Sequence, residues 1–197
     1  TPDGKLAISG SWDKSCILWD LESGQAIKTL IGHTSAVFAV SISPDGKRAI
    51  SGAMDNNCIV WDLENGQTLK KLALHTDYVN AVSIALNKKL AITGSVDKSC
   101  IVWNLENGQV IKTLTGHTES VNVISITSDG KRAISGSGGI YMTGDSDNNC
   151  IVWDLERGQT LKTFTGHKKL VLSINITPDG KQVVSGSWDL KYIVWDL

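Results

Sequence analysis

The feature that most constrains the fold of this chain is a sequence repeat with a period of 42 residues. Tryptophans mark the period at steps of 42, 42, 50 and 42 residues: Trp19, Trp61, Trp103, Trp153 and Trp195. Histidines and cysteines recur at the same steps of 42, 42 and 50 residues: His33, His75, His117, His167, Cys16, Cys58, Cys100 and Cys150. A fixed period of roughly 20 to 50 residues is typical of stacked supersecondary units, so we expect one array of similar units.

The period divides the 197 residues into consecutive units of a single domain. Residues 1–31 form a partial unit, residues 32–73, 74–115 and 116–165 form full units, and residues 166–197 form a second partial unit. The unit at 116–165 contains eight extra residues, and the motif that starts near Ser135 begins again near Thr143. Residues 1–21 and 177–197 represent the same half of a unit. We therefore expect either a fragment of a longer chain or a chain that completes its array with another copy.

Each unit contains four short apolar segments separated by turn residues. In the first full unit, AVFAVSIS and RAISGA flank Asp45-Gly46, and CIVWDL and TLKKL flank Asn65-Gly66. Asp-Gly and Asn-Gly between apolar segments predict hairpins with two-residue turns, in which both turn residues have positive φ. No segment shows a sustained helical period, so we predict four antiparallel strands of about five residues for each unit.

The third predicted strand of each unit indicates how the units are arranged. Its sequence at 58–61, CIVW, is apolar on both faces, so its sheet must be covered on both sides. Radially arranged four-stranded sheets, each packed between two neighbours, meet this requirement. The predicted fold class is therefore all-β: a β-propeller of four-stranded antiparallel blades, incomplete as given, with about four to five blades in this chain.

Two dipeptide motifs indicate the kind of repeat. Gly-His pairs occur at Gly32-His33, Gly116-His117 and Gly166-His167, and Trp-Asp pairs at Trp19-Asp20, Trp61-Asp62, Trp153-Asp154 and Trp195-Asp196. Together with the period, these motifs resemble the WD-repeat propellers over essentially the whole chain. The departures are Leu74 before His75, Asn104 after Trp103, and Tyr192 at a cysteine position.

Each full unit, and the partial unit at 166–197, also contains a histidine, a serine or threonine, an aspartate and a tryptophan. The sets are His33, Ser51, Asp55 and Trp61; His75, Thr93, Asp97 and Trp103; His117, Asp147 and Trp153 with either Ser135 or Thr143; and His167, Ser185, Asp189 and Trp195. Ser, His and Asp also form hydrolase triads, but a nucleophile site occurs once, whereas this set recurs in every unit. The resemblance to WD-repeat proteins implies instead a hydrogen-bonded network that fixes the turn between the second and third strands. No catalytic residue is expected.

Positions at which the units differ are candidates for partner binding. In WD-repeat propellers, the residue before the turn aspartate and the residues beside the leading valine of the first strand lie on one face, the usual docking surface. Aromatic side chains there are typical anchors of interfaces, although they also pack against neighbouring loops. The candidates are Trp12, Phe38, Met54, Tyr78, Asn80, Asn122, Leu170, Leu172 and Trp188, together with Tyr141 and Met142 of the insertion. The alternative for the insertion is a neutral extension of a hairpin that binds nothing.

Composition and charge disfavour several classes of protein. Lys and Arg total 19, Asp and Glu total 20, and the net charge is −1, which argues against a nucleic-acid or membrane-surface protein. The apolar runs are far shorter than the roughly 20 residues of a membrane span. The cysteines fall in different units, without the close pairs of a metal site. We therefore expect reduced cysteines, no metal, no cofactor and a cytoplasmic location.

The function predicted from the sequence is a non-catalytic scaffold that presents one propeller face to a partner protein or peptide. The alternative is a ligand- or peptide-sensing module of a larger multidomain protein. Another copy of the chain, or the remainder of a longer one, is a further expected partner because the end units are incomplete. An enzyme is least expected, since no unrepeated set of acid, base and nucleophile appears.

Overall fold

In the computed structural model, residues 1–85, 89–139 and 147–197 are described, and their only regular elements are β-strands. Five antiparallel sheets follow one another along the chain. The first contains β1 (Leu6–Gly10), β2 (Ser15–Asp20) and β3 (Ala26–Ile31); the second β4 (Val37–Ile42), β5 (Arg48–Ala53), β6 (Cys58–Asp62) and β7 (Gln67–Leu72); the third β8 (Val79–Ile84), β9 (Leu90–Ser95), β10 (Ser99–Asn104) and β11 (Val110–Thr115). The fourth contains β12 (Val121–Ile126), β13 (Arg132–Ser137), β14 (Cys150–Asp154) and β15 (Gln159–Phe164), and the fifth β16 (Val171–Ile176), β17 (Gln182–Ser187) and β18 (Tyr192–Asp196). None of these described elements is a helix that would be long and apolar enough to cross a membrane.

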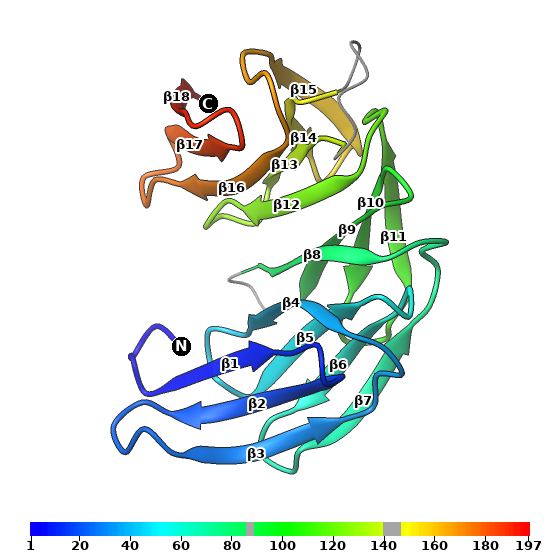
Figure 1. The fold of residues 1–197 in the computed structure, drawn as a ribbon, viewed down its shortest axis with the longest axis vertical. Helices are drawn as coiled ribbons and strands as arrows, with labels where there is room; N and C mark the ends of the chain where they lie inside the picture. Colours follow the sequence, from blue (N-terminus) through cyan, green and yellow to red (C-terminus); the bar gives the residue numbers. More distant parts are fainter. Residues whose placement is uncertain (86–88, 140–146) are drawn as a thin grey trace.

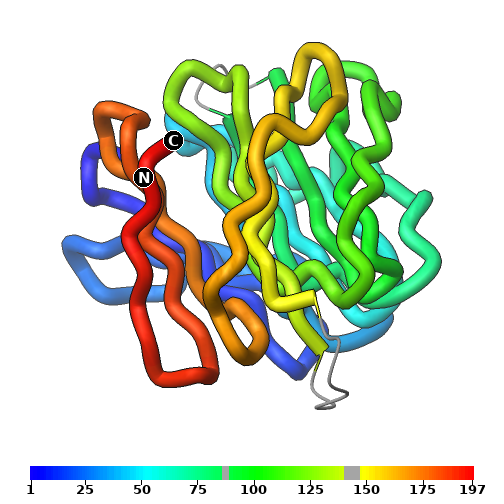
Figure 2. The backbone as a smooth tube through the Cα atoms, turned by 90° about the horizontal axis from the view of Figure 1, so that it is seen from above, coloured from blue at the N-terminus to red at the C-terminus, as the bar shows by residue number. Residues whose placement is uncertain are grey.

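The five sheets are arranged radially, as blades around a common axis. The first strands β4, β8, β12 and β16 lie side by side on the inside of the arrangement, and the fourth strands β7, β11 and β15 lie on the outside (Figure 1). The sheets that contain β1 and β18 lie at the two ends of an open arc (Figure 1), and Figure 2 shows the blades from above. The structure therefore has the all-β, blade-like architecture predicted from the third strand.

The hairpin connections differ from the predicted two-residue turns. Gly46 has a φ of 66°, but Asp45 does not have positive φ, and the Gly46 N–H donates to the Ser43 carbonyl at 2.8 Å. The Ser43 N–H donates to the Arg48 carbonyl, so four residues lie between these two hydrogen-bonded residues. The Asp45 carboxylate accepts the Ser43 hydroxyl and the Lys47 N–H, and these side-chain hydrogen bonds favour the wider turn. The prediction that both turn residues have positive φ is wrong.

The hydrophobic core lies between successive sheets. Cys16, Leu18 and Leu30 of the first sheet pack with Ile59 and Trp61 of the second. Equivalent clusters join the second sheet to the third, the third to the fourth and the fourth to the fifth. The core is therefore a series of layers, each shared by two neighbouring blades.

A glycine in the second strand of each repeat allows the neighbouring sheet to approach closely. A Cβ atom at Gly52 would lie 2.6 Å from Cγ1 of Val79 in the next sheet. The same close approach recurs at three further pairs: Gly10 with Val37, Gly94 with Val121 and Gly136 with Val171. The glycines thus form sockets for the leading valine of the following inner strand.

Candidate functional site

The four residue types singled out by the repeat lie together in each of the second to fifth sheets. In the second sheet, the Trp61 indole N–H donates to Ser51 Oγ at 2.8 Å, and Ser51 Oγ lies 2.7 Å from His33 Nε2. His33 Nδ1 lies 3.0 Å from the Asp55 carboxylate, which also accepts the Thr34 N–H at 2.9 Å. The structure brings together the same sets in the third, fourth and fifth sheets: His75, Thr93, Asp97 and Trp103; His117, Ser135, Asp147 and Trp153; His167, Ser185, Asp189 and Trp195.

The direction of the hydrogen bonds follows from the chemistry of the groups. An indole N–H only donates and a carboxylate only accepts, so in a neutral imidazole Nδ1–H donates to the aspartate and Nε2 accepts. The serine hydroxyl must then donate to Nε2 while it accepts from the indole. Each network thus runs in one direction from tryptophan through serine or threonine and histidine to aspartate.

The networks are closed to solvent at their centre. Ser51, Thr93, Ser135 and Ser185 have no exposed surface, and the histidines are 6% to 8% exposed. Burial acts to raise the pKa of Asp147, but hydrogen bonds from His117 and the Thr118 N–H outweigh it and lower the pKa to about 2. Burial lowers the pKa of His75 despite its hydrogen bond to Asp97. This arrangement can hold a loop against a turn, but it offers no hydroxyl to a substrate.

A second arrangement is an exposed aromatic patch on the first three sheets, made of Trp12, Phe38, Met54 and Tyr78. The side chains of Trp12, Phe38 and Tyr78 are 78%, 41% and 40% exposed, and Met54 is half-buried. The Trp12 and Phe38 rings meet edge to face, with their centroids 6.2 Å apart. The Met54 N–H donates to the Ala36 carbonyl, and the Val96 N–H donates to the Tyr78 carbonyl. These bonds tie the turns after β5 and β9 to the loops before β4 and β8, so patch residues from both kinds of segment lie at the same end of the sheets.

A family model described as WD domain, G-beta repeat, matches residues 1–20, 24–62, 66–104, 108–154 and 158–196. The chain belongs to the WD-repeat family. It is similar to the dynein assembly factor with WD repeat domains 1 of Homo sapiens and Macaca fascicularis, each 42% identical over 40 residues, and of Danio rerio, 40% identical over 40 residues. Each of these matches covers 20% of this chain and 10% of the relative, about the length of one repeat. WD-repeat proteins are generally non-catalytic scaffolds that bind proteins or peptides.

The fourth WD repeat contains the eight-residue insertion, and the structure places it between two hydrogen-bonded landmarks. Ser135 completes the network of His117. The Gly138 N–H donates to the Ser120 carbonyl, as the Met54 N–H donates to that of Ala36, so Gly138 is the equivalent of Met54. The extra residues therefore lie at 139–146, directly before Asp147. Tyr141, Met142 and Thr143 fall at 140–146, outside the described residues.

Two asparagine candidates are engaged with each other across neighbouring blades. The Asn80 side-chain N–H donates to Asn122 Oδ1 at 3.4 Å, and the Asn122 side-chain N–H donates to the Gly138 carbonyl at 2.9 Å. Both side chains are half-buried. They link β8 and β12 to the residue that precedes the insertion.

The last three candidates belong to the fifth sheet, and the structure separates them. Leu172 and Trp188 are 48% and 52% exposed, whereas Leu170 is 7% exposed. Leu170 lies against the backbone of Gly138, where a Cβ atom would come within 2.3 Å of the Leu170 Cα. Leu170 is therefore part of the contact between the fourth and fifth sheets and does not belong to the exposed surface.

Sequence reasoning missed a pocket at the fifth sheet, to which Leu190, Lys191 and Tyr192 contribute. The sequence signal that could have revealed it is the replacement of the repeat cysteine by Tyr192. Among the described residues, no group of three or more His, Cys, Asp or Glu side chains has the geometry of a metal site.

Proposed function

We propose that this WD-repeat chain is a protein-interaction scaffold and that the aromatic patch of Trp12, Phe38, Met54 and Tyr78 is its docking surface. The observation that carries the proposal is the exposure of Trp12, 78%, next to the 41% exposed ring of Phe38. Large exposed aromatic side chains are unfavourable for solubility, yet they are enriched in interfaces and contribute much of the binding energy there. Binding through this patch would bury the two rings and their edge-to-face contact.

The second support for the proposal is the rigidity of the ends of the sheets that carry the patch. The network of His33 holds the turn that follows Met54 against the loop that precedes Phe38. The network of His75 holds the loop that precedes Tyr78 against the Asp97 turn. A surface whose backbone is held in place loses little conformational entropy on binding. The repeated networks thus support a binding role for the side chains that vary between repeats.

The test of the docking surface is affinity capture followed by reconstitution. The chain and its Trp12→Ala, Phe38→Ala, Tyr78→Ala variant are used as parallel baits, and each captured protein is purified and titrated against both. A matched control replaces three similarly exposed outer-strand residues, in Ile27→Ala, Leu69→Ala, Leu161→Ala. We expect the patch variant to lose the partner at an unchanged melting temperature and the control variant to retain it. Equal affinity for all three proteins would remove the aromatic patch as the docking surface.

We also propose a cytoplasmic location. It is supported by Cys16, Cys58, Cys100 and Cys150, which are buried and free. Free thiols persist in reducing compartments, whereas exported proteins commonly pair their cysteines. Imaging of the tagged natural protein in its cell tests this proposal, and a signal confined to an oxidising compartment would contradict it.

A further inference from the structure

Charges are distributed unevenly over the end of the sheets that carries the aromatic patch. This end consists of the loops before the inner strands β4, β8, β12 and β16 and of the turns before the third strands. In the first four sheets, the described residues of this end include six carboxylates and two lysines: Asp13, Asp55, Asp77, Asp97, Glu119, Asp147, Lys14 and Lys98. In the fifth sheet they include one carboxylate and three lysines: Asp189, Lys168, Lys169 and Lys191. The end is therefore acidic beside the patch and basic at the fifth sheet.

The buried networks account for part of the acidic character. With its imidazole neutral, each network carries the negative charge of its aspartate. Burial lowers the pKa of His75, which favours the neutral form there. Burial acts to raise the pKa of Asp55, Asp97 and Asp147, but hydrogen bonds to each carboxylate outweigh it and lower the pKa. These carboxylates thus stay ionised and give the patch a negative potential.

Two further carboxylates lie on the loops of the third and fourth sheets, and both are half-buried. Asp77 directly precedes Tyr78 of the patch and accepts its N–H at 2.8 Å. Glu119 lies over Gly139, where a Cβ atom would come within 2.8 Å of Oε2. Among the residues that the structure describes, neither Asp77 nor Glu119 forms an ion pair. Both carboxylates can therefore receive a cation from a partner.

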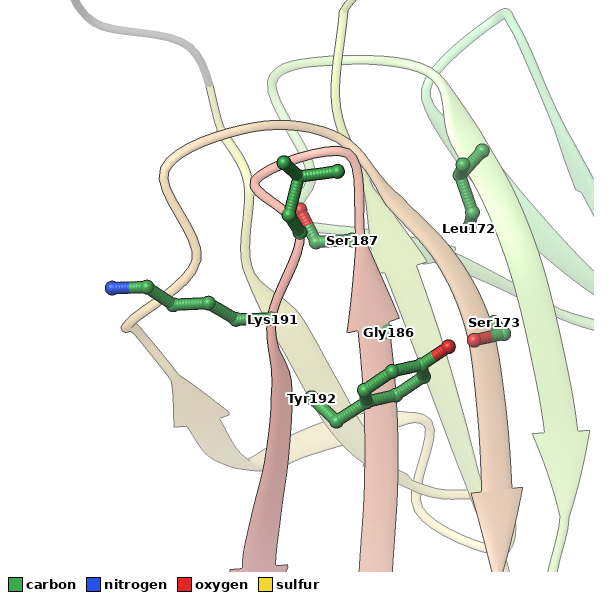
Figure 3. Close-up of a pocket in the computed structure, with 7 residues that line it drawn as sticks. Leu172, Ser173, Gly186, Ser187, Lys191 and Tyr192 are labelled. Atoms are coloured by element: carbon green, nitrogen blue, oxygen red, sulfur yellow. The ribbon is translucent and has the colours of Figure 1, made fainter.

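The fifth sheet shows that the fold does not require this acidic character. The Lys168 N–H donates to Asp189 at 2.9 Å, the bond that a threonine N–H makes in the other networks. In the turn, Leu190 holds the left-handed position with a φ of 67° and is 93% exposed, and the exposed Lys191 follows it. Figure 3 shows the Lys191 side chain extended away from the sheet. The same backbone accepts either charge, so the charge beside the patch is free to match a partner.

An aromatic surface in a negative potential favours cationic side chains. The face of an aromatic ring attracts arginine and lysine, and nearby carboxylates add to this attraction. Arginine fits better than lysine because its planar guanidinium stacks on a ring while its N–H groups donate to a carboxylate. Tyr78, which is 40% exposed, and Asp77 offer these two groups on neighbouring residues. An acidic segment would be repelled by the same charges.

We propose that the aromatic patch docks a basic segment of a partner protein, in which an arginine stacks on the Tyr78 ring and donates to Asp77, and a second cation lies near Glu119. The proposal rests on the proposed function of the patch as a docking surface and adds the chemistry of the partner. The three residues belong to the third and fourth sheets, each of which has a described neighbour on both sides.

The probe for this test is a phage-displayed library of random dodecapeptides. The library is depleted on the Trp12→Ala, Phe38→Ala, Tyr78→Ala variant and then selected on the natural chain, so that peptides that bind elsewhere are removed. We expect the selected peptides to be enriched in arginine and depleted of aspartate and glutamate relative to the starting library. Their affinity should fall as salt is added, because the attraction between exposed charges is screened.

Titrations then locate the cation. The tightest selected peptide carries a fluorescein label, and its binding is followed by fluorescence anisotropy. Asp77→Asn, Glu119→Gln removes both charges but keeps an oxygen to accept the Tyr78 N–H, and we expect it to weaken binding about tenfold. Tyr78→Leu keeps an apolar side chain without the ring and should weaken binding about threefold. Replacing the arginine of the peptide with citrulline, which is neutral and similar in shape, should weaken binding to the natural chain about tenfold.

The matched control removes two exposed carboxylates from the opposite end of the sheets. It is Glu64→Gln, Glu106→Gln, in the turns that follow the third strands of the second and third sheets. This variant has the same net charge as Asp77→Asn, Glu119→Gln, and we expect it to bind the peptide as the natural chain does. Melting temperatures of all variants are compared, so that a loss of binding is separated from a loss of folding.

Two outcomes overturn the proposal. The first is a set of patch-dependent peptides without an enrichment in arginine, or with equal affinity for Asp77→Asn, Glu119→Gln and for the control variant. That outcome leaves the patch as a docking surface for another class of segment. The second is the absence of any patch-dependent peptide, which contradicts the docking surface itself and this proposal with it.

Discussion

The third strands of the fourth and fifth sheets have almost the same sequence but very different environments. β14 reads CIVWD and β18 reads YIVWD. The first four residues of β14 are buried, whereas Tyr192 and Val194 of β18 are 82% and 59% exposed. The fourth sheet has a neighbour on each side, and the fifth has a described neighbour on one side only. Burial in this molecule is therefore a property of the stacking of sheets rather than of a strand alone.

The largest expected difference between the two sheets comes from removing the equivalent tryptophan side chain from each. Trp153 is 1% exposed, and we expect Trp153→Ala to lower the free energy of unfolding by about 3 to 5 kcal/mol. Trp195 is half-buried and stacks on Phe164 at 4.8 Å, so Trp195→Ala should cost less than about 2 kcal/mol. Urea denaturation followed by circular dichroism measures both. Equal losses would mean that the fifth sheet is buried as deeply as the fourth.

Adding a methyl group to a second-strand glycine tests the same difference between sheets. The methyl group overpacks the interface where a neighbouring sheet is present, and it has more room where none is described. Gly94→Ala would bring Cβ to 2.5 Å from Val121 and 2.7 Å from Ile124 in the next sheet, and we expect a loss of about 1 to 3 kcal/mol. Gly186→Ala meets Ser173 and Tyr192, which are exposed and free to rotate, so its loss should be smaller. Thermal melts of the two variants give the ranking. The reverse order would show that Tyr192 is held as firmly as Val121.

The pH dependence of stability tests the hydrogen-bonded networks of the fourth and fifth sheets, which contain Asp147 and Asp189. The folded pKa of Asp147 is lowered to about 2 from 3.8, so its contribution is present above about pH 4 and is lost as the pH falls toward 2. This shift corresponds to about 2 kcal/mol. The pKa of Asp189 is also lowered, against the effect of burial, by the Lys168 N–H and His167. Urea titrations between about pH 5 and 2 should show a smaller slope for Asp147→Asn than for the natural chain. An unchanged slope would remove Asp147 as a source of acid sensitivity.

The smallest expected effect concerns the strained turn of the fifth sheet. Asn56 holds the position equivalent to Leu190 in the second sheet, with a φ of 65°. Asparagine tolerates the left-handed region better than leucine, so Leu190→Asn should raise the free energy of unfolding by about 1 kcal/mol. Asn56→Leu is the mirror experiment and should lower it. A destabilising Leu190→Asn would show that the exposed leucine packs in solution against a part of the chain.

The sequence was sufficient for the features that depend on spacing. The period predicted the blades, and it assigned to each unit the residues that the structure brings together, such as His33 with Ser51 and Asp55. Spacing could not decide whether Ser135 or Thr143 belongs to the network of His117, because both fit the repeat. The backbone hydrogen bond of Gly138 to Ser120 decides it, since it places the insertion after Gly138. It also failed for the Asp45-Gly46 turn, where side-chain hydrogen bonds of Asp45 select a wider connection.

Contacts between sheets were harder to predict than contacts within them. Leu170 occupies a position that is variable in sequence, but it packs against Gly138 of the preceding sheet and is buried. The pocket beside Tyr192 likewise depends on how far the neighbouring side chains of β16 and β17 reach. Such features are set by the angle and distance between blades, which a residue pattern does not contain.

The layered core gives the four cysteines a use as chemical reporters. Cys16, Cys58, Cys100 and Cys150 are buried in four different interfaces, one for each pair of neighbouring sheets. Burial raises the pKa of the Cys16 thiol to about 11 and that of Cys100 to about 12, so neither thiol is reactive while its interface stays closed. An alkylating reagent therefore marks an interface only when it opens. The order in which the four thiols are modified would give the order in which the blades separate, read from one natural chain without a substitution.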